Sequence, residues 1–140
     1  MFLGTYQHTI DKKGRLFIPV RFRTQDNQRF IVTRGLERCL FTFPEDEWER
    51  QQNQIKDQSL MKKEARAFNR LFFSGAAEVI CDKQGRINLP GNLIEYADLG
   101  EEAKIIGVSN RFEIWSVESW LKYEEESTRR YEEIAENLME

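Results

Sequence analysis

The chain has 140 residues, and its composition limits the classes of protein to which it can belong. This length suffices for one domain with a substantial core, so we expect a single domain over residues 1–140. The net charge of −3, taken alone, argues against a protein that binds nucleic acid. The charge is uneven, however, because residues 1–44 hold eight Lys and Arg against three Asp and Glu, and residues 101–140 hold five against eleven.

Two further features bear on the compartment. The sequence has no apolar run long enough to span a bilayer and no segment with the pattern of a secretion leader, which predicts a cytoplasmic protein. Cys39 and Cys81 lie within apolar runs, as small buried residues do. In an intracellular chain this placement predicts unpaired core thiols, and neither a disulfide nor a metal pair.

Short segments rich in β-branched and aromatic residues alternate with turn residues along the chain. Each pair of such segments is separated by a loop of the length found in β-hairpins. We therefore predict four hairpins, in which residues 5–10 pair with 15–18, 30–33 with 40–43, 78–81 with 86–89, and 104–108 with 112–115.

Helical patterns follow the second and fourth hairpins. Pro44 precedes three acidic residues, which predicts a helix that begins there and ends near Lys56. Apolar residues at three- and four-residue steps predict a second, amphipathic helix over about 59–73, between the two halves of the chain. The tail starts at Val117 as a counterpart of the first helix, and an acidic helix with a narrow apolar stripe is expected over about 127–140.

The sequence also contains an internal repeat. The nine residues from Asp11 to Pro19 match those from Asp82 to Pro90 at an offset of 71. Five pairs are identical: Asp11/Asp82, Lys12/Lys83, Gly14/Gly85, Arg15/Arg86 and Pro19/Pro90. The match continues at an offset of 72, so we expect repeat one over about 1–57 and repeat two over about 76–126, sharing one core.

The repeated motif has a physical logic of its own. Asp at its first position and Gly at its fourth favour a type I turn followed by a glycine in the left-handed region. Turn chemistry fully explains Asp11, Gly14, Asp82 and Gly85 as positioning residues. Pairing of each motif arginine with its aspartate across the loop would be a purely structural role for the arginine. A turn does not need arginine, however.

The number of basic residues around the first motif favours a functional role for Arg15. Eight of them occur within thirty residues, more than solubility requires: Lys12, Lys13, Arg15, Arg21, Arg23, Arg29, Arg34 and Arg38. Such residues contact DNA phosphates, and an arginine on a rigid hairpin can bind base edges in a major groove. The second copy has Gln84 and Asn88 in place of Lys13 and Phe17, which predicts a weaker contribution from Arg86.

Residues with the chemistry of an enzyme are sparse. His8 is the single histidine, and no metal-ligating partner lies at a suitable spacing. The glycines are dispersed, so no phosphate-binding loop is expected. Trp48, Trp115 and Trp120 follow apolar strands and are expected to anchor the core. We therefore expect no catalytic residue, no cofactor, no metal and no small-molecule substrate.

The segment from Met1 to Tyr6, the two Asp-x-x-Gly-Arg-x-x-x-Pro motifs and the tryptophan-bearing helices resemble the MraZ family over essentially the whole chain. That family is similar to AbrB-type transcription factors, and the resemblance implies an α+β fold. In this fold two pseudo-repeats form a swapped-hairpin, double-split β-barrel with peripheral helices.

The resemblance also implies a function. It points to a nucleoid-associated transcriptional regulator that binds short direct repeats in double-stranded DNA, usually as a repressor of an operon for cell division and cell-wall synthesis. Its partners would be this DNA and copies of itself in a ring, with an octamer as the favoured assembly. DNA would be contacted by Arg15 and Arg86, with Lys12, Lys13 and Lys83 beside them.

One alternative from another functional class stays open. The acidic carboxy-terminal helix and its apolar stripe could recruit a partner, which would make the chain an oligomeric scaffold for protein interactions. Both functions are compatible with self-association, since separate amphipathic helices leave apolar faces for a neighbouring subunit to cover.

Overall fold

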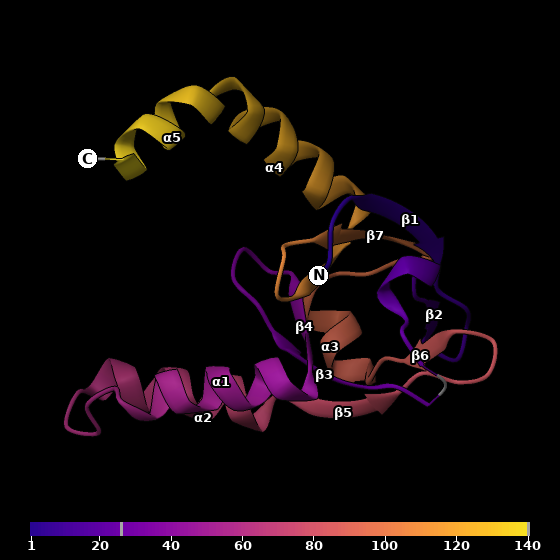
Figure 1. The fold of residues 1–140 in the computed structure, drawn as a ribbon, viewed down its shortest axis with the longest axis horizontal. Helices are drawn as coiled ribbons and strands as arrows, with labels where there is room; N and C mark the ends of the chain where they lie inside the picture. Colours follow the sequence, from indigo (N-terminus) through magenta and orange to yellow (C-terminus); the bar gives the residue numbers. More distant parts are fainter. Residues whose placement is uncertain (26, 140) are drawn as a thin grey trace.

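The structure is a computed structural model that describes residues 1–25 and 27–139, and its fold is mixed α+β (Figure 1). The strands are β1 (Thr5–Thr9), β2 (Arg15–Phe17), β3 (Arg29–Arg34), β4 (Leu40–Pro44), β5 (Ala77–Ile80), β6 (Arg86–Asn88), β7 (Glu102–Gly107) and β8 (Phe112–Ser116). The helices are η1 (Val20–Phe22), α1 (Glu45–Lys56), α2 (Lys63–Ser74), α3 (Gly91–Tyr96), α4 (Val117–Arg129) and α5 (Tyr131–Met139).

The strands form two antiparallel sheets. The larger has the order β1-β7-β8-β4-β3-β5, and the smaller consists of β2 and β6. Within the described residues the larger sheet is open, because its edge strand β1 pairs with β7 alone and its edge strand β5 pairs with β3 alone. The expected closed barrel is therefore not formed.

Two of the four predicted hairpins are confirmed and two are wrong. β3 pairs with β4, and β7 pairs with β8, as predicted. β1 and β2 are instead joined only by the bridge between Ile10 and Leu16, while β5 pairs with β3. The reason is that β2 and β6 pair with each other across the repeats, where Leu16 and Ile87 are both fully buried. Burial of these two apolar side chains favours the pairing between the repeats.

The main core lies between the larger sheet, the β2–β6 ladder and α3. The ring of Phe112 packs against those of Phe2, Phe22 and Phe30, each at a centroid distance of 5.3 Å. Cys39 and Cys81 are buried and unpaired, as the sequence predicts. Both repeats contribute to this single cluster, which explains why neither has a core of its own.

The tryptophans attach helices to the sheet. Trp115 on β8 is buried and contacts Trp120 on α4 at a centroid distance of 5.2 Å. Trp48 on α1 is half-buried and stacks on Phe72 of α2 at 5.5 Å, which holds the α1–α2 hairpin together. The prediction that these residues anchor the core is confirmed for Trp115, whereas Trp48 and Trp120 lie at its margin.

Two helix boundaries differ from the prediction for local reasons. The helix α2 starts at Lys63, because Ser59 binds the N–H groups of Met61 and Lys62 in a turn. The acidic tail is two helices, since α4 continues to Arg129 and α5 begins at Tyr131. At the junction the N–H of Arg130 donates to the carbonyl of Ser127, a tight turn that ends α4.

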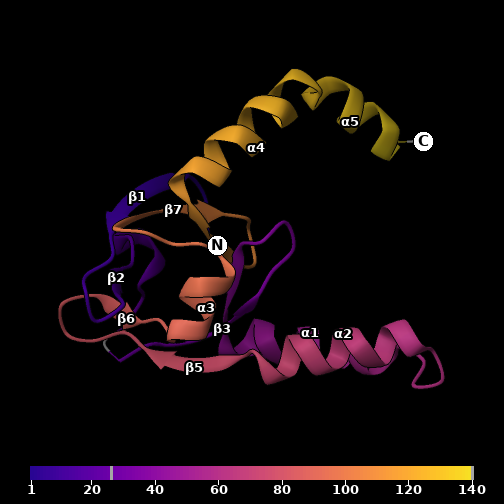
Figure 2. The same cartoon turned by 180° about the vertical axis from the view of Figure 1, so that it is seen from behind.

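The small sheet and the long helices lie at opposite ends of the molecule. Figure 1 shows β2 and β6 on one side, and on the other side the α1–α2 hairpin and α5 as two separate projections. Figure 2 shows the same arrangement from behind. The repeated motifs are therefore clear of the helical projections.

Candidate nucleic-acid interface

The first copy of the motif forms a turn that is fixed by one carboxylate. Oδ1 of Asp11 accepts hydrogen bonds from the N–H groups of Lys13 and Arg15, each at 2.9 Å. Oδ2 of Asp11 accepts a third bond from Nε of Arg15 at 2.7 Å. The same side chain thus holds the backbone of the turn and the orientation of the guanidinium group.

The second copy repeats this geometry atom by atom. Oδ1 of Asp82 accepts from the N–H groups of Gln84 and Arg86 at 2.9 Å, and Oδ2 accepts from Nε of Arg86 at 2.9 Å. Gly14 and Gly85 have φ angles of +82° and +85°, which glycine adopts without strain. The predicted turn chemistry is confirmed at both sites, and so is the structural pairing of each arginine with its aspartate.

This pairing leaves part of each arginine available. Only Nε is used by the aspartate, and within residues 1–25 and 27–139 the Nη nitrogens of Arg15 and Arg86 have no hydrogen-bond acceptor. The side chain of Arg15 is 34% exposed and that of Arg86 is 19% exposed. Each arginine is therefore held through Nε and keeps its Nη donors, the pair of groups with which arginine binds a guanine edge bidentately.

The ladder between β2 and β6 brings the two motifs together. Arg15 lies opposite Asn88, and Phe17 lies opposite Arg86. Residues opposite one another share a face of the ladder, so these four side chains lie on its outer face while Leu16 and Ile87 face the core. Arg15 and Arg86 are diagonal neighbours, for which strand geometry gives a separation of roughly 7–8 Å. We call this outer face, with the two turns at its ends, the arginine ribbon.

Further hydrogen bonds lock the turns onto the ladder. The N–H of Ile18 donates to the carbonyl of Gly85 at 2.8 Å, and the N–H of Leu89 donates to the carbonyl of Gly14 at 2.8 Å. Each turn is thus held by the strand of the other repeat. The position of one arginine relative to the other is fixed by backbone pairing and not by flexible side chains.

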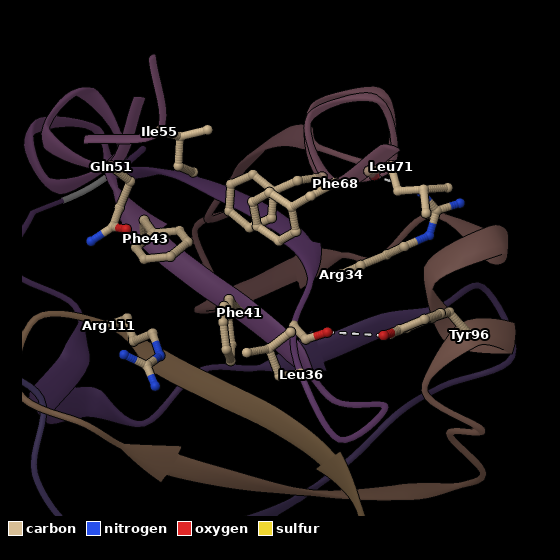
Figure 3. A pocket seen from close by; sticks show the side chains of 12 residues that line it. Arg34, Leu36, Phe41, Phe43, Gln51, Ile55, Phe68, Leu71, Tyr96 and Arg111 are labelled. Atoms are coloured by element: carbon tan, nitrogen blue, oxygen red, sulfur yellow. Dashed lines mark hydrogen bonds between the residues drawn. The ribbon is translucent and has the colours of Figure 1, made fainter. Parts of the chain in front are cut away.

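The predicted lysines surround this face, whereas part of the predicted basic cluster does not. Lys12, Lys13 and Lys83 are exposed on the turns. Arg29 is occupied by ion pairs with Glu78 at 2.7 Å and Glu45 at 3.7 Å. The guanidinium carbons of two other arginines, Arg34 and Arg38, lie 5.9 Å and 5.0 Å from the ring centroid of Tyr96 on α3. Arg34 and Tyr96 line an apolar pocket of about 480 Å³ between the α1–α2 hairpin and the sheet (Figure 3).

Arg23 belongs to the second turn, although it comes from repeat one. Its Nε donates to the carbonyl of Ile18 at 3.0 Å, and its guanidinium group lies so close to Gly85 that a Cβ there would collide with it. The repeat-equivalent residue, Ile94, lies against Gly14 of the first turn. Repeat one therefore adds a positive charge beside the second turn, where Gln84 replaces Lys13, and the weaker contribution of Arg86 stays a prediction.

Phe17 is a second residue that sequence reasoning missed as part of this face. It is 41% exposed, and the guanidinium carbon of Arg86 lies 5.9 Å from its ring centroid. In the sequence analysis, Phe17 was considered only as the counterpart of Asn88. The alternation of a strand was the available signal, because Leu16 and Ile18 point inward and Phe17 must then point outward.

The electrostatics of both turns favour the charged aspartate. The N–H of Arg15 and its guanidinium group hold the pKa of Asp11 below its usual value. At Asp82 partial burial acts in the opposite direction, yet the hydrogen bonds from the N–H and side chain of Arg86 leave the pKa lowered. Both carboxylates are ionised at neutral pH and keep their arginines oriented.

The described residues were also compared with the requirements of a metal site and of a membrane span. Among residues 1–25 and 27–139, no group of three or more His, Cys, Asp and Glu side chains could hold a metal ion. His8 is half-buried on β1. In the same part of the chain, no helix combines the length and apolar character needed to cross a bilayer.

Comparison with known families matches the chain twice to one family model. The model is described as "MraZ protein, putative antitoxin-like", and it matches residues 1–71 and again residues 72–140. The two matches divide the chain at the internal repeat, with one motif arginine in each. Together they cover the whole chain, and the protein therefore belongs to the MraZ family.

Proposed function

We propose that this protein is a sequence-specific DNA-binding transcriptional regulator that contacts DNA through the arginine ribbon. The observation that carries the proposal is that Arg15 and Arg86, each held by an aspartate through Nε, lie on the outer face of one two-stranded ladder. A β-ribbon has the size that a major groove about 12 Å wide admits. The MraZ family is a regulator-type family and not an enzyme family.

The charges around the ribbon support this function. Lys12, Lys13 and Lys83 are exposed on the turns, and Arg23 lies beside the second turn. They would contact phosphates on either side of a groove, while Arg15 and Arg86 bind base edges. Net charge alone would argue against this function, but the acidic residues of the tail lie on helices at the other end of the molecule (Figure 1).

The finer features of the proposal rest on the resemblance described above. The regulator would bind short direct repeats upstream of its own operon for cell division and cell-wall synthesis, acting as a repressor and associating with the nucleoid. The exchange of strand partners between β2 and β6 supports an AbrB-like swapped-hairpin arrangement. A ring of copies, an octamer by family resemblance, would present one ribbon per subunit to the repeats and add their affinities.

A footprint on DNA from upstream of the protein's own gene tests this proposal. The full chain is titrated at moderate salt against that DNA and against a scrambled duplex of equal composition. We expect protection of short repeats at protein concentrations that leave the scrambled duplex free. Equal affinity for both duplexes would contradict sequence-specific regulation.

A second candidate function is an interaction scaffold that uses the acidic tail. The observation in its favour is that α5 has no buried residue although it carries exposed Tyr131 and Leu138. A truncated chain that ends at Arg130 distinguishes the two candidate functions. It is tested on a duplex that contains a single repeat, because binding to such a duplex is not multivalent. DNA regulation predicts unchanged binding to this duplex, whereas a scaffold predicts that the DNA is not bound by either chain.

A further inference from the structure

One polar side chain on the outer face of the β2–β6 ladder has no role in the proposed function so far. Asn88 lies on β6 directly opposite Arg15 and is exposed, between the buried Ile87 and Leu89. Asparagine is rare in strands, because its short amide side chain competes for backbone hydrogen bonds. Strand formation therefore does not explain why this position of the ladder holds an asparagine.

The amide of Asn88 is also not needed by the neighbouring turn. Within residues 1–25 and 27–139 it forms no hydrogen bond with another group. Its Oδ1 lies 3.4 Å from the position of a Cβ at Gly14, which places the amide beside the first turn. Asp11 already accepts the hydrogen bonds that hold this turn. The donor and the acceptor of Asn88 are thus both available to a ligand.

The amide supplies a chemistry that the basic residues of the ribbon lack. Arginine and lysine side chains only donate hydrogen bonds, which suits the two acceptors of a guanine edge. An adenine edge presents one acceptor, N7, and one donor, the N6 amino group, and an asparagine amide can bind both at once. Of the four side chains on the outer face of the ladder, Asn88 is the one that carries both groups.

The spacing of Arg15 and Asn88 suits two neighbouring base pairs. Residues directly opposite one another in an antiparallel pair have Cβ atoms roughly 4.5–5.5 Å apart. Base pairs follow one another along the duplex at about 3.4 Å. Arg15 is held at Nε by Asp11, and Asn88 is fixed on the opposite strand of the ladder. When Arg15 binds a guanine, the amide of Asn88 is therefore placed at the next base pair.

The second half of the ribbon has no such amide across the ladder. Arg86 lies opposite Phe17, whose ring cannot form the two hydrogen bonds of an adenine edge. Gln84 carries an amide on the second turn and not on the ladder, where its N–H donates to Asp82. The two repeats therefore place different chemistry beside their arginines, although the turns are alike.

We propose that Asn88 is a specificity-determining residue that binds an adenine in the base pair next to the guanine bound by Arg15. The first half of the ribbon then recognises a guanine with an adjacent adenine, while the second half recognises a guanine through Arg86 alone. This inference rests on the proposed function, because it names the bases that the arginine ribbon distinguishes.

Selection from a pool of random duplexes tests the assignment without knowledge of the operator. The full chain is used at fixed salt as the wild type, Asn88→Ala, Arg15→Ala and the control Gln84→Ala, after circular dichroism has verified folding. We expect the wild type and Gln84→Ala to select a guanine with an adenine in the adjacent base pair. Asn88→Ala should keep the guanine and accept any base at the position of the adenine, and Arg15→Ala should lose the guanine.

The possible outcomes separate this inference from the proposed function. Wild-type sequences without an adenine next to a guanine would overturn the inference alone. So would an Asn88→Ala protein that still selects the adenine, or a Gln84→Ala protein that no longer does. A wild type that selects no sequence at all would contradict the proposed function and this inference with it.

Changes in the DNA provide a second measurement on the selected duplex. Inverting the A·T pair should weaken wild-type binding by roughly 5- to 150-fold, the value of a bidentate contact, and should affect Asn88→Ala much less. Replacing the adenine by 7-deazaadenine, which lacks the N7 acceptor, should weaken the wild type and leave Asn88→Ala unchanged. Equal losses for the two proteins would contradict a contact from Asn88.

A further variant keeps the shape of the side chain. Asn88→Asp lacks the amide donor, and its carboxylate accepts a hydrogen bond from the N4 amino group of cytosine. We expect this variant to select cytosine in place of the adenine, with a lower affinity because the carboxylate repels the phosphates. Retention of the adenine by Asn88→Asp would overturn the inference even if Asn88→Ala failed to fold.

Discussion

The guanidinium carbon of Arg86 lies 5.9 Å from the ring centroid of Phe17, whereas Arg15 faces Asn88 at the repeat-equivalent position. Both arginines are also held by an aspartate through Nε. The two halves of the arginine ribbon are therefore alike in their turns and different in the neighbour that each arginine has across the ladder. This difference predicts unequal sensitivity to substitution.

Replacement of Phe17 by asparagine gives Arg86 the same neighbour across the ladder that Arg15 has. We expect Phe17→Asn to weaken binding to the specific duplex by about 2- to 5-fold. This is the loss of affinity that corresponds to an exposed cation–π contact of about 0.5–1 kcal/mol. The effect should vanish in an Arg86→Ala background, because the contact is then already lost. Asn88→Phe is the matched substitution on the other half. A loss that persists without Arg86 would show that Phe17 does not act through this arginine.

Acid should weaken the two turns in a defined pH range. The folded-state pKa values of Asp11 and Asp82 lie below their unfolded values, so ionisation of these groups stabilises the folded state above the unfolded pKa of about 3.9. This contribution is lost as the pH falls through that value towards the lowered pKa values.

Asp11→Asn combined with Asp82→Asn checks this pH dependence by urea unfolding. The wild type should have the larger free energy of unfolding at pH 7, and the difference should shrink as the pH falls below about 4. A difference that is constant from pH 7 to pH 3 would exclude ionised aspartates as its source.

Gly85→Ala should be more harmful than Gly91→Ala. Gly85 has φ +85°, and a Cβ there would collide with the guanidinium group of Arg23, whereas nothing lies within 4 Å of a Cβ at Gly91. We expect thermal unfolding to show a loss of roughly 1 kcal/mol or more for Gly85→Ala and a small change for Gly91→Ala. Arg23→Ala should relieve part of the loss at Gly85. The absence of any relief would contradict the contact between the two residues.

The turns could be predicted from the sequence because they depend on neighbouring residues. Asp11 and Gly14 fix the first turn within five residues, and Pro44 with three acids fixes the start of α1. The hairpins β3–β4 and β7–β8 were also predictable, because a short loop joins each pair. Local signals are therefore sufficient where the contacts are local.

Contacts between the repeats were not predictable in this way. The pairing of Leu16 with Ile87 spans 71 positions, and no turn or periodicity in the sequence indicates it. Arg23 lies against Gly85 of the second turn because of that pairing. Its position in the sequence had instead placed its charge with the first turn. The apolar pocket was missed for the same reason, since its lining combines α1, α2, α3 and β4.

The buried thiols should be unreactive at neutral pH. Burial raises the pKa of Cys39 and Cys81, so the thiolate that reacts with disulfide reagents is scarce in the folded protein. We expect both thiols to be modified only at the rate of unfolding, with rapid modification in urea. Fast modification of the folded chain would contradict the burial of these residues.

The central claim is that Arg15 and Arg86 recognise bases from one ribbon, and the ratio of specific to non-specific affinity tests it most directly. This ratio is measured at fixed salt for the wild type, Arg15→Ala, Arg86→Ala and the control Arg129→Ala, which removes an exposed charge from α4. We predict that each ribbon variant loses about 1–3 kcal/mol of binding to the specific duplex and that its specificity ratio falls, while Arg129→Ala behaves as the wild type. An unchanged ratio in Arg15→Ala and Arg86→Ala would contradict the account.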